Sequence, residues 1–389
     1  MNFTFRDTIS KEVLCNYLSR AVTMAGGPLS PKQTPYVADF ILDVGAKYIC
    51  RATHCWRPSI DDYATYPDQK RFIEQLHEKD PEVVFEACIF ENVTREVETI
   101  PIPPYVFEEF GLPVENRCFS LEKLLFPNGF LWELIGKEAG VPDITQTETQ
   151  MFFYYRACEY MKLGYEALHL GQIEWIGYHD PDRVAYTAVL SRIRAFAKHH
   201  ARRGFVILNC HTHGDIGSDG RLLFDFHMFP SRPKAVGSEP HPPTADNPQR
   251  CILEHDHLDS IYGKSLGGRT YSGWECDSLP YLVELDNYGN NPAIRNQPNP
   301  DLIESWGMDE ITWFANQPDH YRAEFLRYAY EWMQDCAKGD GYFAMPCQRI
   351  AELYNKQGEI VSYQYRAYFP DAIEGGTGDQ AVIRQLWKE

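Results

Sequence analysis

Segments with the apolar spacing of a helix alternate with short apolar runs typical of strands through most of this 389-residue sequence. This order is typical of parallel βα units, in which each helix leads back to the start of the next strand. The predicted strands are residues 48–53, 83–90, 165–170, 205–210, 222–226, 281–285, 311–315 and 342–345. Eight strands in this order predict an α/β fold, a closed (β/α)8 barrel of the TIM type.

One connection is too short for an ordinary βα unit. Residues 213–221 alone join the fourth and fifth predicted strands, whereas a parallel crossover takes about a dozen residues or more. Ser218-Asp219-Gly220 is also a good turn sequence. We therefore expect either an antiparallel hairpin at this point or a barrel that lacks one helix.

We expect a single barrel domain over residues 1–389, decorated by four further segments. These are N-terminal helices in residues 1–45, an insertion at 92–146, a long loop at 228–279 and a C-terminal extension at 350–389. The long loop is rich in proline and glycine, which interrupt regular backbone ladders. Loops of this length are usually functional, so we expect a rim or lid over the C-terminal strand ends that brings Trp274 or Glu275 to the pocket.

Composition excludes several classes of partner. The net charge is −18 and Lys and Arg do not cluster, so we expect no nucleic acid partner. No apolar run approaches the roughly 20 residues that cross a bilayer, and the first ten residues are polar. The eleven cysteines form no CxxC pair. We therefore expect a cytoplasmic protein without a membrane partner, and the sequence leaves its oligomeric state open.

Polar side chains recur at every second position where three predicted strands end. Because side chains alternate between the two faces of a strand, we expect these residues to face the barrel axis. Buried ionisable groups are costly unless they are paired or have a chemical task. The pattern therefore indicates either an active site or a structural network, with Arg51 pairing Glu86 and His227 pairing Asp286. The expected inward residues are Asn209, His211, His213, Asp225, His227, Glu284 and Asp286.

Glycoside hydrolysis needs two carboxyl groups, one protonated acid and one ionised nucleophile or base. Glu284 is the expected ionised member, because Val283 and Leu285 on either side are apolar and should face outward. Glu174 is the expected acid, because the neighbouring Trp175 would raise its pKa. Asp225 is the alternative acid.

A divalent metal site is the main alternative. His211-Thr212-His213 places two imidazoles on one face of a strand, and Asp225, His227 and Glu284 would complete the ligand set. That arrangement would make the protein a metal-dependent barrel hydrolase or sugar isomerase. Otherwise we expect no cofactor.

Tryptophans near the strand ends favour a carbohydrate substrate, because flat rings match the apolar faces of sugars. We expect these aromatic residues and the polar residues around them to contact the substrate. The expected substrate-binding residues are Arg51, Glu86, Gln172, Asn209, His211, His213, His227, Trp274, Asp286, Trp313 and Asn316.

Residues 205–214, 222–233 and 280–289 resemble uncharacterised (β/α)8-barrel proteins of the glycoside-hydrolase superfamily. The resemblance is architectural and implies a carbohydrate-active hydrolase. One departure is that Asn209-Cys210-His211 stands where the commonest barrel glycosidases place Asn-Glu. The usual acid is absent from its usual place, so the chain is either a glycosidase with its acid elsewhere or a sugar-binding barrel without catalysis.

Overall fold

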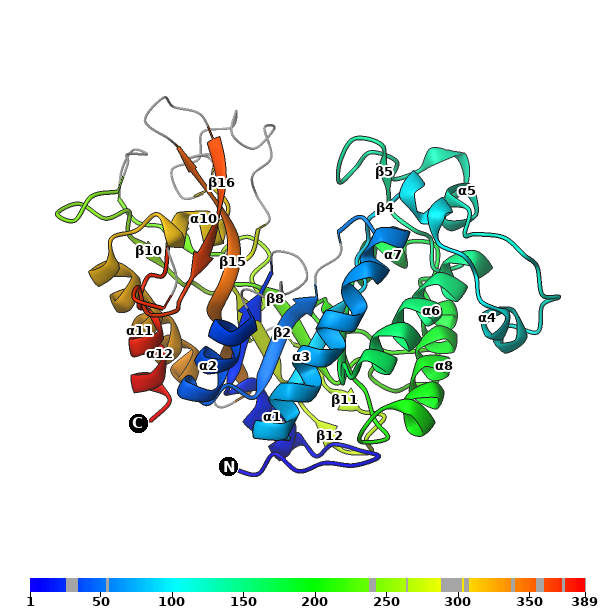
Figure 1. Ribbon diagram of the computed structural model, residues 1–389, viewed down its shortest axis with the longest axis horizontal. Helices are drawn as coiled ribbons and strands as arrows, with labels where there is room; N and C mark the ends of the chain where they lie inside the picture. The colour runs from blue at the N-terminus through cyan, green and yellow to red at the C-terminus, as the bar shows by residue number, and fades with distance from the viewer. Residues whose placement is uncertain are drawn as a thin grey trace.

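Eight parallel strands form a barrel with helices packed around its outside (Figure 1). This computed structural model describes residues 1–25, 34–53, 56–237, 243–263, 265–287, 303, 308–336, 340–354, 360–372 and 375–388. The barrel strands are β1 (Ala21–Met24), β2 (Tyr48–Thr53), β3 (Val84–Cys88), β6 (Ala167–Gln172), β7 (Ile207–His211), β8 (Phe226–Pro230), β13 (Tyr281–Glu284) and the run formed by β14 (Gly341–Phe343) and β15 (Met345–Tyr354). The predicted TIM-type barrel is confirmed.

The last strand closes the barrel because it pairs with neighbours on both sides. β14 lies parallel to β13, with Phe343 opposite Val283. β15 lies parallel to β1, with Met345 opposite Val22. Ala344 separates β14 from β15 and donates its backbone N–H to the carbonyl oxygen of Val283 at 2.8 Å. The two elements are therefore one strand that joins β13 to β1.

Helices pack against the outer face of this sheet. The main ones are α2 (Thr34–Val44) after β1, α3 (Tyr66–Lys79) after β2, α6 (Thr147–Leu163) after β3, α8 (Val184–His200) after β6 and α11 (Asp319–Cys336) before β14. Their buried stripes meet the apolar side chains that the strands turn outward, such as Val206, Leu208 and Cys210. This outward set is the one that alternation along the strand predicts.

Two connections differ from the regular βα unit. β7 and β8 are parallel, and the residues between them contain no helix. The prediction of a barrel lacking one helix is thus confirmed, and the antiparallel hairpin is wrong. In its described residues, the segment between β8 and β13 holds two small hairpins. These are β9 (Lys234–Ala235) with β10 (Cys251–Ile252), and β11 (Gly268–Arg269) with β12 (Glu275–Cys276).

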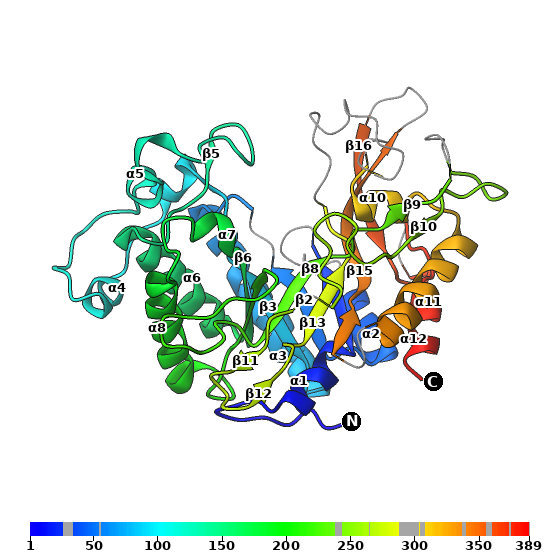
Figure 2. The same cartoon turned by 180° about the vertical axis from the view of Figure 1, so that it is seen from behind.

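The β11–β12 hairpin lies at the amino ends of the barrel strands, beside the N-terminal segment and α1 (Lys11–Leu18) (Figure 2). There Trp274 donates its indole N–H to the carbonyl oxygen of Ile9 at 3.0 Å and packs on the apolar cluster that contains Phe5 and Tyr17. The prediction that this part of the long loop covers the C-terminal strand ends and brings Trp274 or Glu275 to a pocket is wrong. The hairpin shields part of the apolar floor of the barrel, at the amino ends of the strands, from water.

Two structures rise beyond the carboxyl ends of the strands (Figure 1). One is the insertion after β3, which contains β4 (Val93–Thr94), η2 (Arg95–Thr99), α4 (Pro104–Glu109), α5 (Leu121–Leu124), η3 (Pro127–Gly129) and β5 (Ala139–Gly140). The other is the antiparallel pair of β15 with β16 (Ile360–Arg366), next to α10 (Glu310–Ala315). The remaining elements are η1 (Ile60–Thr65), α7 (Ile173–Ile176) and α12 (Gln380–Leu386).

Two strand predictions need correction. Residues 21–24, expected within N-terminal helices, form the barrel strand β1. Residues 311–315, expected as the seventh strand, belong to α10, which Asp309 caps by accepting the backbone N–H of Thr312. All six residues of α10 are buried, so its apolar run carries no helical stripe that sequence periodicity could detect.

In the described part of the chain, no helix combines the length and the apolar character needed to cross a membrane.

Candidate active site

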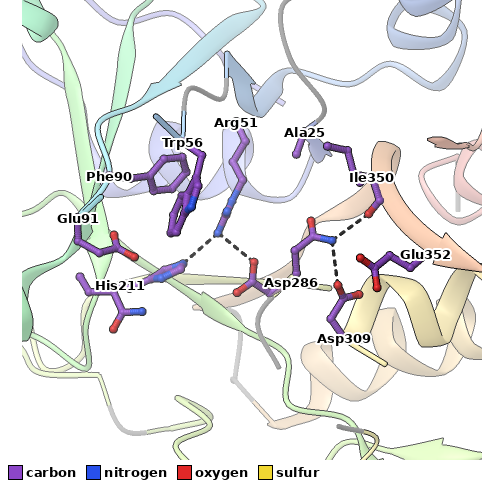
Figure 3. Close-up of a pocket in the computed structure, with 12 residues that line it drawn as sticks. Ala25, Arg51, Trp56, Phe90, Glu91, His211, Asp286, Asp309, Ile350 and Glu352 are labelled. Carbon is purple, nitrogen blue, oxygen red and sulfur yellow. Dashed lines mark hydrogen bonds and ion pairs between the residues drawn. The ribbon is translucent and has the colours of Figure 1, made fainter. Parts of the chain in front are cut away.

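A cavity of about 400 Å³ opens at the carboxyl ends of the barrel strands (Figure 3). It lies between the insertion after β3 and the β15–β16 pair. This is the end of the barrel at which TIM-barrel enzymes assemble their sites. The lining residues are Ala25, Arg51, Trp56, Phe90, Glu91, Gln172, His211, Asp286, Asn287, Asp309, Ile350 and Glu352. Of the residues predicted from sequence, Arg51, Gln172, His211 and Asp286 meet here.

Arg51 is the central cation of the cavity. Its guanidinium forms an ion pair with Glu284, and Nη2 lies 3.5 Å from Asp286 Oδ1 and 3.1 Å from His211 Nε2. Its backbone has a φ of 53°, in the left-handed region, and the pairing of β2 with β3 loses its regular register between Ile49 and Thr53. Such a bulge redirects side chains, and here it turns Arg51 into the barrel directly after the inward Cys50.

Glu284 lies beneath the cavity between two arginines. Its Oε2 accepts from Arg349 Nη1 at 2.8 Å, while Oε1 faces Arg51. Arg349 reaches further, to Thr23 Oγ1 at 3.2 Å and Asn287 Oδ1 at 3.0 Å. Glu284 is fully buried and does not line the cavity, so it holds two cations in place and is not directly open to a substrate.

Asp286 is the ionised carboxylate of the cavity. Burial alone would raise its pKa, but the guanidinium groups of Arg51, Arg349 and Arg232 together hold the pKa well below its ordinary value. Its position at the end of β13 is fixed through the backbone, because its N–H donates to Glu310 Oε2 at 3.2 Å. Asp286 is therefore charged over the whole pH range in which the protein would work.

Glu91 is the cavity carboxyl that holds a proton at the highest pH. It follows β3, is 5% exposed, and burial raises its pKa to about 7. Among the described residues, no hydrogen-bond partner reaches its Oε2. The left-handed Gly171 makes room for it, since a Cβ there would lie 2.4 Å from that oxygen. Glu91 thus carries a proton near neutral pH and directs its carboxyl at the cavity (Figure 3).

His211 is neutral in this setting. Burial and the adjacent Arg51 lower its pKa to about 3, and its Nε2 accepts from the Arg51 guanidinium at 3.1 Å. Its other ring nitrogen, Nδ1, then carries the hydrogen and can donate. His211 therefore accepts from Arg51 through one ring nitrogen and can donate to a bound molecule through the other.

The wall on the β15 side is polar. Asn287 Nδ2 donates to Asp309 Oδ2 at 3.2 Å and to the carbonyl oxygen of Ile350 at 2.9 Å. Burial raises the pKa of Asp309 to about 6. Asp309 and Glu352 face the cavity from this side (Figure 3). This wall therefore offers several oxygen acceptors to hydroxyl groups.

A hydrogen-bonded layer deeper in the barrel contains Glu86 and Asn209. Glu86 accepts from Tyr48 at 2.7 Å, from Asn209 Nδ2 at 2.6 Å and from the backbone N–H of Arg51 at 3.1 Å. Asn209 Oδ1 lies 2.6 Å from His169 Nδ1. Both residues face the axis, as predicted, but they support the cavity from below and do not line it. The predicted contact between Arg51 and Glu86 exists through the backbone of Arg51.

Asp225 and His227 face away from the axis, contrary to prediction. Asp225 Oδ2 accepts the backbone N–H of Leu208 at 2.8 Å, and His227 Nδ1 lies 2.9 Å from Ser265 Oγ. The inward residues of this strand are Phe226 and Met228, which fill the apolar floor. Barrel strands are buried on both faces, so polarity could not fix which set of residues points inward.

The remaining predicted residues lie outside the cavity. Glu174 is an exposed residue of α7, and His213 Nε2 lies 2.8 Å from the carbonyl oxygen of Asp259. Trp313 is fully buried in α10 and donates to the carbonyl oxygen of Gln249, while Asn316 donates to the backbone of Thr312 and Glu352. None of these four side chains lines the cavity.

The metal alternative is not supported by the arrangement of its expected ligands. His211 faces Arg51, Glu284 lies between two guanidinium groups, and Asp225 and His227 point out of the barrel. Across the described ranges, no three His, Cys, Asp or Glu side chains are grouped so that they could hold a metal ion. The predicted five-residue cluster is therefore wrong.

Glu91 is, for the chemistry of the cavity, the most important of the lining residues that sequence reasoning missed. The inward side chains of β3 occupy even-numbered positions, with Glu86, Cys88 and Phe90 in one series, so strict alternation would turn Glu91 outward. The strand ends at Cys88, and alternation no longer holds beyond it. A carboxyl within three residues of a strand end, next to an aromatic residue, was the available signal.

No protein-family model matches this chain, and neither does any curated protein. Three solved structures share its arrangement loosely. They are a GH113 β-1,4-mannanase (10% identity, 96% of this chain and 99% of that chain, TM-score 0.45), the Nostoc punctiforme debranching enzyme soaked with acarbose (11%, 96% and 81%, 0.45) and the glycoside hydrolase domain of PelA from Pseudomonas aeruginosa (10%, 84% and 94%, 0.37). The expected architectural resemblance to glycoside-hydrolase barrels is found in these three structures.

Proposed function

We propose that the protein hydrolyses glycosidic bonds, with Glu91 as the general acid and Asp286 as the ionised carboxylate. One observation carries this proposal. Among the carboxyl groups that line the cavity, Glu91 and Asp286 have pKa values that their surroundings move in opposite directions, to about 7 for Glu91 and below the ordinary value for Asp286. A pair of this kind supplies the proton donor and the anion that glycoside hydrolysis requires.

The positions of the two strands support the assignment. β3 and β13 are four strands apart in either direction around the eight-stranded barrel. A glycosidic bond held between them would present its oxygen to one carboxyl and its anomeric carbon to the other. Retaining and inverting enzymes share this layout and differ in the distance between the two carboxyl groups.

Glu91 gives its proton to the glycosidic oxygen while the bond from that oxygen to the anomeric carbon breaks. Asp286 either attacks the anomeric carbon, forming an ester that water then hydrolyses, or takes a proton from a water molecule that attacks directly. One water is consumed, and two sugar hydroxyl groups are formed.

The other lining residues have positioning roles in this proposal. Arg51 keeps Asp286 ionised, and His211 and Gln172 offer hydrogen bonds to hydroxyl groups. Trp56 packs edge-on against Phe90, with ring centroids 5.3 Å apart, and is 36% exposed, so part of its ring is open to the apolar face of a sugar. Glu284 acts through Arg51 and Arg349, and Glu174 and Asp225 have no catalytic part.

A substitution series tests the assignment. Purified protein would be assayed on p-nitrophenyl glycosides of glucose, mannose, galactose and N-acetylglucosamine and on soluble polysaccharides. In Glu91→Gln and Asp286→Asn we expect kcat to fall at least about 100-fold. Glu174→Gln is the matched control and should keep wild-type turnover. A 2,4-dinitrophenyl glycoside needs little proton donation, so the initial release of dinitrophenol should be largely restored in Glu91→Gln and not in Asp286→Asn.

Three outcomes would count against the proposal. Wild-type turnover in Glu91→Gln would exclude Glu91 as the acid. Loss of activity in Glu174→Gln would return the role to the residue first expected from sequence. Sugar binding without hydrolysis of any substrate would make the protein a non-catalytic carbohydrate-binding barrel. If a substrate is hydrolysed, NMR of the anomer that forms first distinguishes retention from inversion.

A further inference from the structure

A second cavity, of about 350 Å³, is formed by residues of the insertion after β3 together with Arg57. Its lining residues are Arg57, Thr94, Arg95, Glu96, Leu121, Trp132 and Glu138. Trp56 lines the first cavity and the next residue, Arg57, lines the second. The two cavities are therefore neighbours, with one peptide unit between the side chains that enter them.

Trp132 forms a fixed aromatic surface in this second cavity. The residue bridges to Gly140, and a Cβ at Gly140 would lie 3.0 Å from the indole ring. The glycine therefore lets the ring pack directly on the backbone of β5. Trp132 is nevertheless 38% exposed, so the rest of the ring faces the opening. A braced, half-open indole of this kind loses little conformational entropy when a flat apolar face packs against it.

The polar lining of the second cavity is mixed in charge. Arg57 and Arg95 supply hydrogen-bond donors, and Glu96 and Glu138 supply acceptors, all from exposed positions. Arg95 also lies 3.3 Å from Glu98. Equal numbers of cations and anions match a neutral polyhydroxylated ligand better than an anion or a cation, since sugar hydroxyl groups both donate and accept.

We propose that the second cavity binds a further sugar unit of the chain whose bond is cleaved at Glu91 and Asp286. This rests on the proposed function and deepens it, because it makes the substrate an oligosaccharide or polysaccharide that extends over Trp56 towards Trp132. Trp56 and Trp132 are the two aromatic contacts along this path. Small glycosides fill the first cavity alone.

Binding can be measured without turnover, by electrophoresis of the full chain in gels that contain a neutral polysaccharide: glucomannan, pullulan or hydroxyethyl cellulose. Neutral polymers avoid unspecific attraction to a protein of net charge −18. We expect retardation of the wild type and of Glu91→Gln in at least one gel. Trp132→Ala should lose at least half of that retardation. The matched control is Phe130→Ala, because Phe130 lies two residues away, is 39% exposed and does not line the second cavity.

Kinetics on the retarding polysaccharide gives the second readout. In Trp132→Ala, kcat/KM on the polysaccharide should fall at least tenfold while that on the p-nitrophenyl glycoside stays within twofold. Equal loss on both substrates, no loss on either, or no retardation of the wild type in any gel would overturn the inference. Trp132-dependent retardation without any hydrolysis would leave the second site standing and refute the proposed reaction, so the two failures are distinguishable.

Discussion

The guanidinium of Arg51 lies 3.5 Å from the carboxylate of Asp286, and the same nitrogen atom faces Glu284 and His211. All four side chains are buried, so the charge of one depends on the presence of the others. Removing one partner of a buried ion pair leaves an uncompensated charge, which is more damaging than the loss of the contact itself.

The first prediction concerns Arg51→Gln. Without the cation, the pKa of Asp286 rises, so the carboxylate becomes protonated at low pH and activity is lost there first. The acidic limb of the pH profile of kcat/KM should move to higher pH, and the free energy of unfolding should fall by about 3–5 kcal/mol. Urea unfolding and the pH profile check the two effects. Arg71→Gln, an exposed control on α3, should change neither.

The second prediction concerns the pH dependence of stability through Glu91. The pKa of Glu91 is about 7 in the folded protein and ordinary in the unfolded chain, so the folded state binds more protons between about pH 4.5 and 7. The proton on Glu91 therefore stabilises the folded state at low pH, by at most about 3 kcal/mol. This stabilisation is lost as the pH rises through 7. The stability difference between wild type and Glu91→Gln should therefore become less favourable to the wild type as pH rises. A pH-independent difference would contradict the raised pKa.

The third prediction concerns Glu284→Gln, which distinguishes a positioning role from a catalytic one. Loss of the carboxylate leaves Arg51 and Arg349 facing each other without their shared anion. We expect the free energy of unfolding to fall by about 3–5 kcal/mol, so that the protein unfolds at a lower urea concentration. We expect activity to be lost as well. Unchanged stability with turnover reduced by orders of magnitude would show instead that Glu284 acts on the substrate. Circular dichroism at each urea concentration separates these results.

The fourth prediction concerns metals. The residues that sequence grouped as ligands have other partners, so EDTA should leave activity and melting temperature unchanged. Elemental analysis of the purified protein checks this directly. Stoichiometric zinc or manganese that is lost together with activity, and is absent from His211→Ala, would restore the metal-dependent alternative.

The barrel could be predicted because its evidence is local and repeated. The apolar stripe of α8 packs against the outward residues of the strands, such as Val206 and Leu208, and both patterns can be read from the sequence. Their repetition along the chain predicts a closed barrel. β1 was missed because Ala21–Met24 is only four residues long and is buried throughout, which leaves no alternation to detect.

The site was predicted less completely, for reasons that lie in the backbone. Asp286 and His211 follow the regular alternation of their strands and were found. Arg51 was chosen for its position, but its inward direction depends on a left-handed residue in a bulge. Glu91 lies past the end of its strand, where no period applies. Asp225 was misplaced because both faces of β8 are buried and the choice between them is made by the neighbouring strands.

The strand formed by β14 and β15 completes the pocket late in the synthesis of the chain. Arg349, Ile350 and Glu352 are provided by the same strand that joins β13 to β1. A chain that leaves the ribosome N-terminus first exposes Glu284 long before Arg349 is available to it. The pocket therefore does not exist in a chain whose synthesis has not yet passed Glu352. Ligand binding therefore requires that β15 has paired with β1, and a bound sugar would stabilise this pairing against unfolding.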